Sequence, residues 1–403
     1  MTAGLRSTRR GGRLRGLGAL ASLPFAAAGV AGCSGGGSVA GEAGAVPAAP
    51  VLPTPMATSV QTSDGTWATV PMGRLDEPLN TFWQLFYRPA GSASWSDQVE
   101  ATATATNGGL VLAATGTSLL VGVRPSVNLT FTPMISTSNG GRSWSDGLVT
   151  ATLAARPDAL AIAGTEALAL VGSRTGPRVL AASRGISTWR SLVTRGALAG
   201  GAGGKACGLG AITAVGYLGA RPLLGGSCAN SGIVGLFAQA VGGWRLVGPV
   251  LPRPLDRGQA EVLALQTFGA RALALIAVVT GRSTNLAVAR SSASGWSASP
   301  PLAVADNEQV ASFGPAGPGG FFALLQEPSG ADRLAVSGRR GGPWQQLPAP
   351  PPGAATVAFN ADGPTNALVA QGTRFSVWSL RPGSQIWAKA QVTDVPVQYG
   401  SSS

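Results

Sequence analysis

A tryptophan recurs along this chain in similar surroundings, preceded by a turn rich in Gly and Ser and followed by a short strand-like run. Seven tryptophans share this setting at intervals of 43 to 55 residues: Trp95, Trp144, Trp189, Trp244, Trp296, Trp344 and Trp387. Self-similarity at a period of roughly 20 to 50 residues indicates a repeat architecture, in which each unit packs against the next. The repeat therefore limits the chain to a small set of folds.

Strand-like runs fill each interval between these tryptophans. Residues 158–190, for example, contain the apolar runs ALAIAG, ALALVGSR and RVLAASR, separated by turns and followed by Trp189. Short runs of this kind, broken by Gly, Asn, Ser or Pro, are typical of strands and hairpins. Four strands in each such interval are the composition of a propeller blade. No helical period of useful length follows Gly32, so we expect an all-β fold, a β-propeller of four-stranded blades.

The number of blades follows from counting the units. Six complete units lie between Trp95 and Trp387, and strand-like runs at residues 58–62, 67–72 and 79–88 can form another. We therefore predict seven blades; the alternative is six, with the N-terminal strands augmenting the last blade. Each repeated tryptophan is expected to begin an outer strand and to bury its ring between blades, so that the repeat reflects packing.

The first residues predict export and lipid anchoring. Five arginines precede an apolar run, which ends in Val30-Ala31-Gly32-Cys33, a match to the bacterial lipobox. The apolar run is short for a membrane-spanning helix. We expect residues 1–32 to be a lipoprotein signal peptide and Cys33 to be acylated, by either the Sec or the twin-arginine route. Residues 33–58, rich in Gly, Ser, Ala and Pro, would be a flexible tether, and residues 59–400 a single propeller domain. The protein would then lie outside the cytoplasm, held on the cell membrane by its lipid.

The charge of the chain argues against nucleic acid as a partner. Part of its net charge of +12 belongs to the leader, and the remaining arginines are scattered singly rather than clustered on one segment. We expect a monomer.

The cysteines and the absence of histidine limit the chemistry further. Cys207 and Cys228 would be exported together into an oxidising compartment, where a pair usually forms a disulfide; two free thiols or half of a metal site are the alternatives. They flank two strand-like runs, 211–216 and 222–227, whose antiparallel pairing would bring them near bridging distance within one blade. Without histidine, an ordinary zinc or iron site is excluded, and we expect no metal and no cofactor.

One turn resembles the Asp-box of sialidase-type (BNR-repeat) propellers. In the segment 137–144, TSNGGRSW, the motif positions are Thr137, Asn139, Gly141, Ser143 and Trp144, with Asn139 in place of the usual Asp. An Asn side chain can still accept hydrogen bonds from the backbone amides of a tight turn. The segments 79–96 and 107–114 also resemble secreted actinobacterial sialidase-like lipoproteins of unassigned function. The resemblance implies a fold more than an activity, because propellers host many unrelated functions.

The resemblance to sialidases implies a catalytic set that the sequence supplies poorly. Retaining sialidases use a tyrosine nucleophile, acidic partners and three arginines that hold the substrate carboxylate. The nearest approach to their arginine motif is Phe86-Tyr87-Arg88-Pro89, which lacks the residue between Arg and Pro. None of Tyr87, Tyr217 and Tyr399 has an acidic partner in a recognisable motif. We therefore expect a non-catalytic module that binds a glycan, a cell-wall component or a protein; the alternative is a divergent sialidase-like glycoside hydrolase.

A ligand would be expected at one face of the propeller. The loops from each outer strand to the next inner strand, and those from the second strand to the third, share that face and carry many of the charged residues. The candidate ligand residues are Arg124, Asp158, Arg174, Glu261, Arg282, Asp306 and Glu308.

Replacing Cys33 tests the predicted anchor. The Cys33→Ser chain has no thiol to acylate, so we expect it to be released into the medium or to accumulate as an uncleaved precursor. Mass spectrometry of the N-terminal peptide, together with detergent phase partition, measures both outcomes. A Cys33→Ser protein that is cleaved normally and stays in the membrane would contradict the lipoprotein prediction.

Overall fold

The computed structural model describes residues 57–395 apart from 75–76, 78–79, 99–107, 125–130, 151–156, 173–175, 184–185, 318, 331, 339–341 and 361–362. The chain divides into two units, Met1–Ala45 and Val46–Ser403, and every described residue belongs to the second. The predicted signal peptide, Cys33, nearly all of the tether, Arg174 and Tyr399 lie outside the described residues. None of the described helices is long and apolar enough to cross a membrane.

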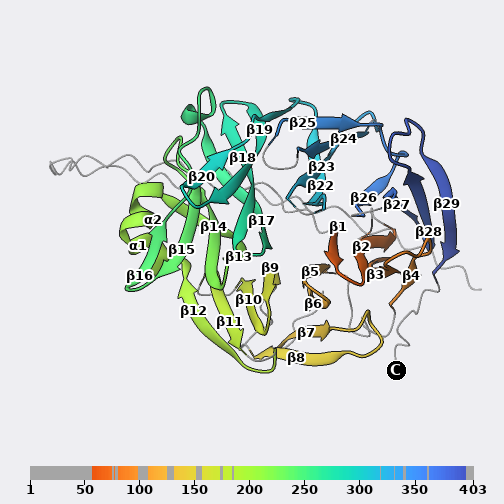
Figure 1. Cartoon of the computed structure of the whole chain (residues 1–403), viewed down its shortest axis with the longest axis horizontal. Helices are drawn as coiled ribbons and strands as arrows, with labels where there is room; N and C mark the ends of the chain where they lie inside the picture. The colour runs from red at the N-terminus through yellow and green to blue at the C-terminus, as the bar shows by residue number, and fades with distance from the viewer. Residues whose placement is uncertain are drawn as a thin grey trace, which may run out of the picture. The chain divides into compact units, whose positions relative to one another are not determined.

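The described strands form successive four-stranded antiparallel meanders, numbered here as blades 1 to 7 in chain order (Figure 1). Blade 1 contains β1 (Thr58–Thr62), β2 (Gly65–Gly73), β3 (Thr81–Pro89) and β4 (Ser96–Asp97). Blade 2 contains β5 (Leu110–Thr115), β6 (Ser118–Val123), β7 (Phe131–Thr137) and β8 (Ser145–Thr150). Blade 3 contains β9 (Pro157–Ala163), β10 (Glu166–Val171), β11 (Arg178–Ser183) and β12 (Trp189–Thr194).

The later blades repeat the pattern. Blade 4 contains β13 (Leu209–Leu218), β14 (Arg221–Cys228), β15 (Gly235–Ala240) and β16 (Gly243–Leu246). Blade 5 contains β17 (Gln259–Phe268), β18 (Arg271–Thr280), β19 (Ser283–Ser292) and β20 (Gly295–Ala298), with β21 (Leu302–Val304) added on β19. Blade 6 contains β22 (Gln309–Pro315), β23 (Phe321–Gln326), β24 (Asp332–Ser337) and β25 (Trp344–Leu347). Blade 7 contains β26 (Ala354–Ala358), β27 (Thr365–Gln371), β28 (Arg374–Leu380) and β29 (Ala388–Asp394).

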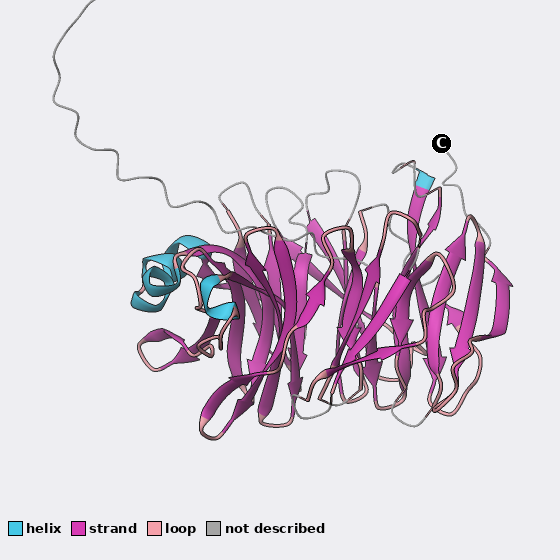
Figure 2. Cartoon of the chain, turned by 90° about the horizontal axis from the view of Figure 1, so that it is seen from above, coloured by secondary structure: helices cyan, strands magenta, loops and turns pink. Residues whose placement is uncertain are grey.

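The architecture is a β-propeller, as the repeat predicted. The grouping of strands is consistent with seven blades, and β1 pairs with β2 rather than with an outer strand of blade 7. Blades 4 and 5 are joined where Ser227 of β14 pairs with Glu261 of β17. Seen from the side, the strands run between two layers of loops (Figure 2). The loops into each first strand and those from second to third strands lie at one edge of each meander, because neighbouring strands are antiparallel.

Two short helices accompany the strands, although the sequence has no helical period of useful length after Gly32. Helix α1 (Arg195–Gly200) and helix α2 (Ala202–Cys207) lie between blades 3 and 4, and a 3-10 turn covers Leu255–Arg257. The hydroxyl of Thr194 caps α1 by accepting a hydrogen bond from the Ala197 amide at 3.2 Å. Six residues are too few to show a helical period in the sequence, so the packing around these segments decides their conformation.

The repeated tryptophans stand within one residue of the start of each fourth strand. Trp95 is buried, and the other six are partly buried against the hydrophobic clusters of the blades. Trp144 of blade 2, for example, meets the ring of Trp67 of blade 1 edge-on, with centroids 5.7 Å apart. The repeat therefore reflects packing between and within blades, as predicted.

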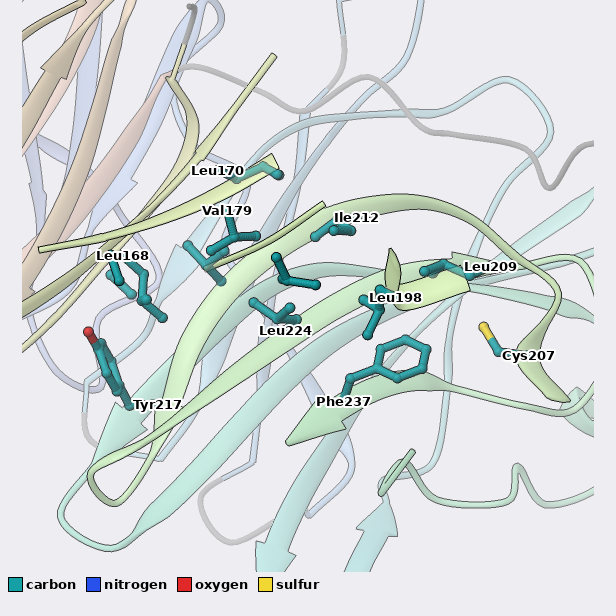
Figure 3. Packing of buried hydrophobic residues seen from close by; sticks show 14 of the residues in the cluster. Leu168, Leu170, Val179, Leu198, Cys207, Leu209, Ile212, Tyr217, Leu224 and Phe237 are labelled. Carbon is teal, nitrogen blue, oxygen red and sulfur yellow. The ribbon is translucent and has the colours of Figure 1, made fainter. Parts of the chain in front are cut away.

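The core consists of clusters between neighbouring blades. Figure 3 shows the cluster between blades 3 and 4, where Leu168, Leu170 and Val179 face Ile212 and other apolar side chains of the next blade. Each blade is apolar on both faces and each face needs a neighbour, so the fold is complete only when blade 7 also packs against blade 1.

The turn that resembles an Asp-box is held by its own polar side chains. Asn139 Oδ1 accepts a hydrogen bond from the Ser143 amide at 3.0 Å, and Thr137 Oγ1 accepts one from the Gly141 amide at 3.0 Å. Gly140 and Gly141 have φ values of 70° and 80°, which a residue with a Cβ adopts only with strain. Asn139 therefore does in this turn what the sequence led us to expect of an acceptor side chain.

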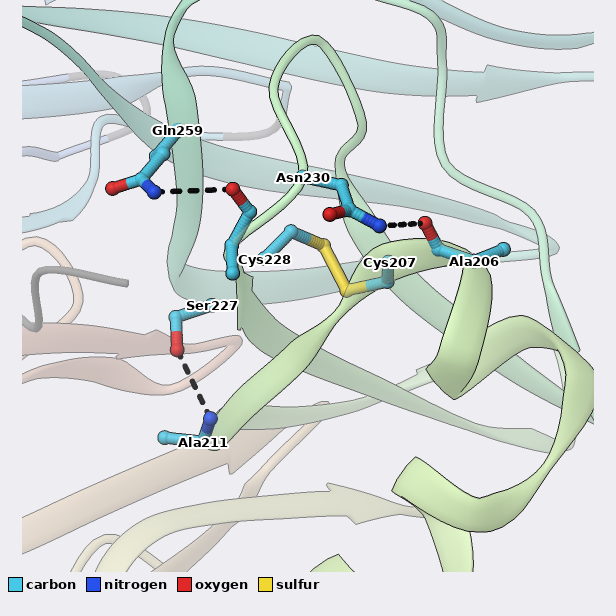
Figure 4. The surroundings of a disulfide bond; sticks show 8 residues. Ala206, Cys207, Ala211, Ser227, Cys228, Asn230 and Gln259 are labelled. Carbon is cyan, nitrogen blue, oxygen red and sulfur yellow. Dashed lines mark hydrogen bonds between the residues drawn. A yellow bond between two sulfur atoms is a disulfide. The ribbon is translucent and has the colours of Figure 1, made fainter. Parts of the chain in front are cut away.

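Cys207 and Cys228 form a disulfide between helix α2 and blade 4, with their Cα atoms 5.0 Å apart (Figure 4). Cys207 ends α2 and Cys228 ends β14, and both are fully buried. The Asn230 side chain also donates a hydrogen bond to the Ala206 carbonyl at 2.8 Å. The predicted pairing is confirmed, and it fastens the helical insertion to the blade.

Removing this disulfide tests its contribution to stability. We expect the Cys207→Ala/Cys228→Ala double variant to lose about 3 kcal/mol of unfolding free energy, because the bridge restricts the unfolded chain across about 20 residues. Chemical denaturation of both proteins measures the difference, and dithiothreitol should destabilise only the unmodified protein. Equal midpoints for the two proteins would show that the bridge adds nothing to stability.

Candidate functional site

A cavity of about 530 Å³ lies at the centre of the propeller. Strands β1, β5, β9, β13, β17 and β22, the first strands of blades 1 to 6, provide its wall. The apolar lining residues include Val60, Val111, Ala113, Ala159, Ala161, Val215, Leu263, Leu265 and Phe313, and the polar ones Thr58, Gln61, Thr213, Gln266 and Thr267. The side chains of the wall are thus mainly aliphatic.

Threonine hydroxyls join neighbouring first strands in this wall. Thr213 of β13 donates a hydrogen bond to the Val262 carbonyl of β17 at 2.6 Å, and Thr267 of β17 donates one to the Tyr217 carbonyl at 2.8 Å. Most first strands of a propeller do not pair with one another, so side chains must satisfy such backbone groups. These hydroxyls therefore hold the wall in shape.

Arg124 and Asp158 meet at one end of the cavity. Arg124 directly follows β6, and Asp158 is the second residue of β9. Arg124 Nη2 lies 2.6 Å from Asp158 Oδ1, and the two side chains are 19% and 42% exposed. They are the only ionisable side chains among the described residues that line the cavity. The structure thus brings together two candidates that are 34 positions apart in the sequence.

The other candidate residues that the structure describes do not line this cavity. Arg282 and Asp306 are exposed on loops at the same edge of their blades. Glu261 is buried in β17. Glu308 has a structural role, because its carboxylate accepts hydrogen bonds from Arg333 Nε at 2.7 Å and from the Ala305 amide at 2.8 Å.

Tyr87 and Tyr217, the two described tyrosines among those considered for catalysis, are packed into the fold. Tyr87 stacks on Trp67 with centroids 4.2 Å apart, and its hydroxyl donates to the Asp64 carbonyl at 2.8 Å. Burial is the main cause that raises the pKa of both Tyr87 and Tyr217, the opposite of what activates a nucleophile. Neither tyrosine lines the central cavity.

Arg88, the arginine of the partial sialidase motif, is likewise not at the central cavity. It is buried between blades 1 and 7, where Nη1 donates to Asn366 Oδ1 at 3.2 Å and the guanidinium lies over the Trp95 ring.

The described residues contain no group of three acidic or cysteine side chains that could hold a metal ion.

Sequence reasoning found the rim of the cavity and missed its wall. The polar wall residues Thr213 and Gln266 lie within strand-like runs, where alternation alone does not tell which face meets the channel. Gln266 Oε1 is buried and accepts no hydrogen bond from a described residue. A polar side chain within an otherwise apolar run was the available signal, as for Thr213 in the β13 run LGAITAVGYL.

Comparisons with known proteins show the fold alone. No protein-family model matches the chain, and no curated protein sequence matches it either. The periplasmic gluconolactonase PpgL of Pseudomonas aeruginosa has a similar structure, with 12% identity, a TM-score of 0.51, and coverage of 82% of this chain and 96% of that protein. A Bacteroides uniformis protein provisionally described as a 6-phosphogluconolactonase is similar at 10% identity and a TM-score of 0.51, with 83% and 97% covered. The chain shares their β-propeller architecture.

The Glu308–Arg333 pair predicts a specific pH dependence of stability. Hydrogen bonds from Arg333 hold the pKa of Glu308 below its usual range, so the stabilisation is present above about pH 4.3, the pKa of an unfolded glutamate, and is lost as the pH falls through the folded value. We expect Glu308→Gln to cost about 1–3 kcal/mol at pH 7 and progressively less in acid. Urea unfolding between pH 7 and pH 3 measures this difference, with the exposed Asp306→Asn as control. If the difference in unfolding free energy between the unmodified protein and Glu308→Gln stayed constant from pH 7 to pH 3, the predicted pH dependence would be wrong.

Proposed function

We propose that this propeller is a non-catalytic binding module, held outside the cytoplasm by acylation of Cys33, which binds a protein ligand at the Arg124 end of its central cavity. The observation that carries the proposal is the composition of the cavity: an aliphatic wall with one ion pair at its end. Ligand sites commonly combine an apolar wall with a few placed polar groups.

The wall favours a protein ligand over a glycan or a cell-wall sugar. Sugar hydroxyls lose their hydrogen bonds to water when they enter a cavity lined mainly by aliphatic side chains. Two of the polar wall residues, Thr213 and Thr267, already donate their hydroxyl hydrogens to backbone carbonyls. An apolar side chain of a protein ligand loses no hydrogen bond there. A charged group beside that side chain would reach Arg124 or Asp158, whose side chains are partly exposed.

The same composition supports binding without turnover. Glycoside hydrolysis requires a placed nucleophile or base and a separate acid with a raised pKa. Asp158 is the one acid among the described lining residues, and its carboxylate already pairs with Arg124.

We also propose that the chain is a diverged relative of sialidase-type propellers. The hydrogen bonds of Asn139 and Thr137 in the turn before Trp144 support this relation. This relation concerns the fold and not the ligand site. The turn connects the third strand of blade 2 to the fourth, so it lies at the edge of the blade opposite Arg124.

Panning a displayed peptide library on the full exported chain tests the proposed function. We expect enrichment of peptides in which an apolar residue neighbours a charged one. Their binding should weaken roughly tenfold in Arg124→Ala, since a charge-assisted hydrogen bond is lost. Arg282→Ala is the matched control, because it removes an exposed arginine from the same edge outside the cavity. Fluorescence anisotropy with labelled peptides measures each affinity.

Two results would contradict the proposal. Binding on a glycan array without any peptide enrichment would show that the ligand is a carbohydrate. Hydrolysis of a fluorogenic sialoside that disappears in Tyr87→Phe or Tyr217→Phe would instead make the protein a glycoside hydrolase.

A further inference from the structure

A second cavity, of about 380 Å³, lies between blades 1 and 7 at the edge of the blades opposite Arg124. The β1–β2 turn, the end of β3 and, from the segment between β26 and β27, Asn360, Gly363 and Pro364 line it. Its lining includes several side chains with hydroxyl or amide groups, among them Thr62, Ser63, Ser92 and Asn360. The candidate residues named above for ligand binding are absent from it.

Arg88 is the only charged side chain among the described residues that line this second cavity. It is 7% exposed. Successive side chains of β3 point to opposite faces of the blade. Tyr87 packs against blade 2, so Arg88 points the other way and faces blade 7, as Phe86 does.

The guanidinium of Arg88 has no acidic partner among the described residues. Nη1 donates to Asn366 Oδ1, an uncharged acceptor that also receives a hydrogen bond from Trp95 Nε1 at 3.3 Å. No described residue accepts a hydrogen bond from Nε or Nη2 of Arg88. The carboxylate of Asp64, the closest acid on the β1–β2 turn, lies on the other side of the blade, beside Gly140.

A buried cation without an anion is unusual, because losing its hydration is costly unless a partner of opposite charge replaces the water. Burial lowers the pKa of Arg88, yet arginine keeps its proton in proteins. The positive charge therefore stays beside a cavity whose lining includes several hydroxyl and amide side chains.

We propose that this second cavity is a binding site for an oxyanion on a polar ligand, a carboxylate, sulfate or phosphate group, which pairs with the free side of the Arg88 guanidinium. The planar guanidinium forms paired hydrogen bonds with such groups. The wall hydroxyls and amides suit the uncharged, hydroxylated part of the ligand. Most of them already have hydrogen-bond partners, as Thr66 has in Asn360 Oδ1 at 3.0 Å, so Arg88 provides the free donors.

Isothermal titration calorimetry of the full exported chain tests the proposal. Sodium sulfate, sodium phosphate and sodium glucuronate serve as probes at constant ionic strength, with glucose as the uncharged counterpart of glucuronate. We expect saturable binding of at least one oxyanion at a stoichiometry of one, and weaker or no binding of glucose. The inorganic salts and glucuronate together distinguish a free ion from a carboxylate on a sugar.

Two variants locate the site. Arg88→Gln should weaken oxyanion binding roughly ten- to a hundredfold, because hydrogen bonds to charged groups are lost. Ala90→Phe leaves Arg88 intact and places a ring at the exposed rim of the second cavity, so it should weaken binding even if Arg88→Gln fails to fold. Arg271→Gln, which removes an exposed charge from the β17–β18 turn, is the matched control and should bind as the unmodified protein does.

Thermal unfolding provides an independent readout. Sulfate stabilises most proteins non-specifically by exclusion from their surface. The measured quantity is therefore the increase in unfolding temperature that sulfate causes in the unmodified protein beyond the increase that it causes in Ala90→Phe. Absence of saturable binding, equal affinity for glucose and glucuronate, or binding that Ala90→Phe leaves unchanged would each overturn the proposal. None of these outcomes depends on whether a peptide binds at Arg124.

Discussion

The contact between blade 1 and blade 7 is the interaction on which the rest of this propeller depends. All four strands of each blade are consecutive in the chain, so no shared strand joins the first blade to the last. Side chains and one backbone bridge do this instead. Phe86 and Phe375 stack with centroids 3.7 Å apart, Ser59 donates a hydrogen bond to the Val357 carbonyl at 2.8 Å, and the Gly73 amide donates one to the Gly372 carbonyl at 2.8 Å. The central cavity keeps its wall only while this contact holds, because the wall consists of first strands from six separate blades.

The closing contact differs chemically from the interface between blades 3 and 4. Between blades 3 and 4 the cluster is aliphatic and aromatic, whereas the interface of blades 1 and 7 adds Arg88, Thr66 and Asn366 to its apolar part. Polar groups in an interface are satisfied only in one arrangement, so they select the register in which the two ends of the chain meet. The same polarity leaves a buried cation facing a cavity, from which the proposed oxyanion site follows.

Much of the fold could be read from the sequence, and particular features show why. The tryptophan repeat, the strand and turn pattern and the pairing of Cys207 with Cys228 all express local rules that hold wherever the segment lies. Helix α2 could not be predicted, because Gly-rich AGGKAC has a low helix propensity and is held by its packing and by the disulfide. For the site, Arg124 and Asp158 were found from their loops, whereas the buried pairing of Glu308 with Arg333 depends on a contact across 25 residues.

The sequence by itself determined the four-stranded repeat, the acceptor role of Asn139 in its turn and the cysteine pair, since each depends on residues close together along the chain. Only the tertiary structure decided which side chains face the two cavities. Arg88 illustrates the reason: in the sequence it is one of 27 arginines, next to Tyr87 on an ordinary strand. Among the described residues, the partner that blade 7 gives Arg88 is the uncharged Asn366, which lies 278 residues away along the chain. No local pattern specifies what so distant a segment places beside a charge.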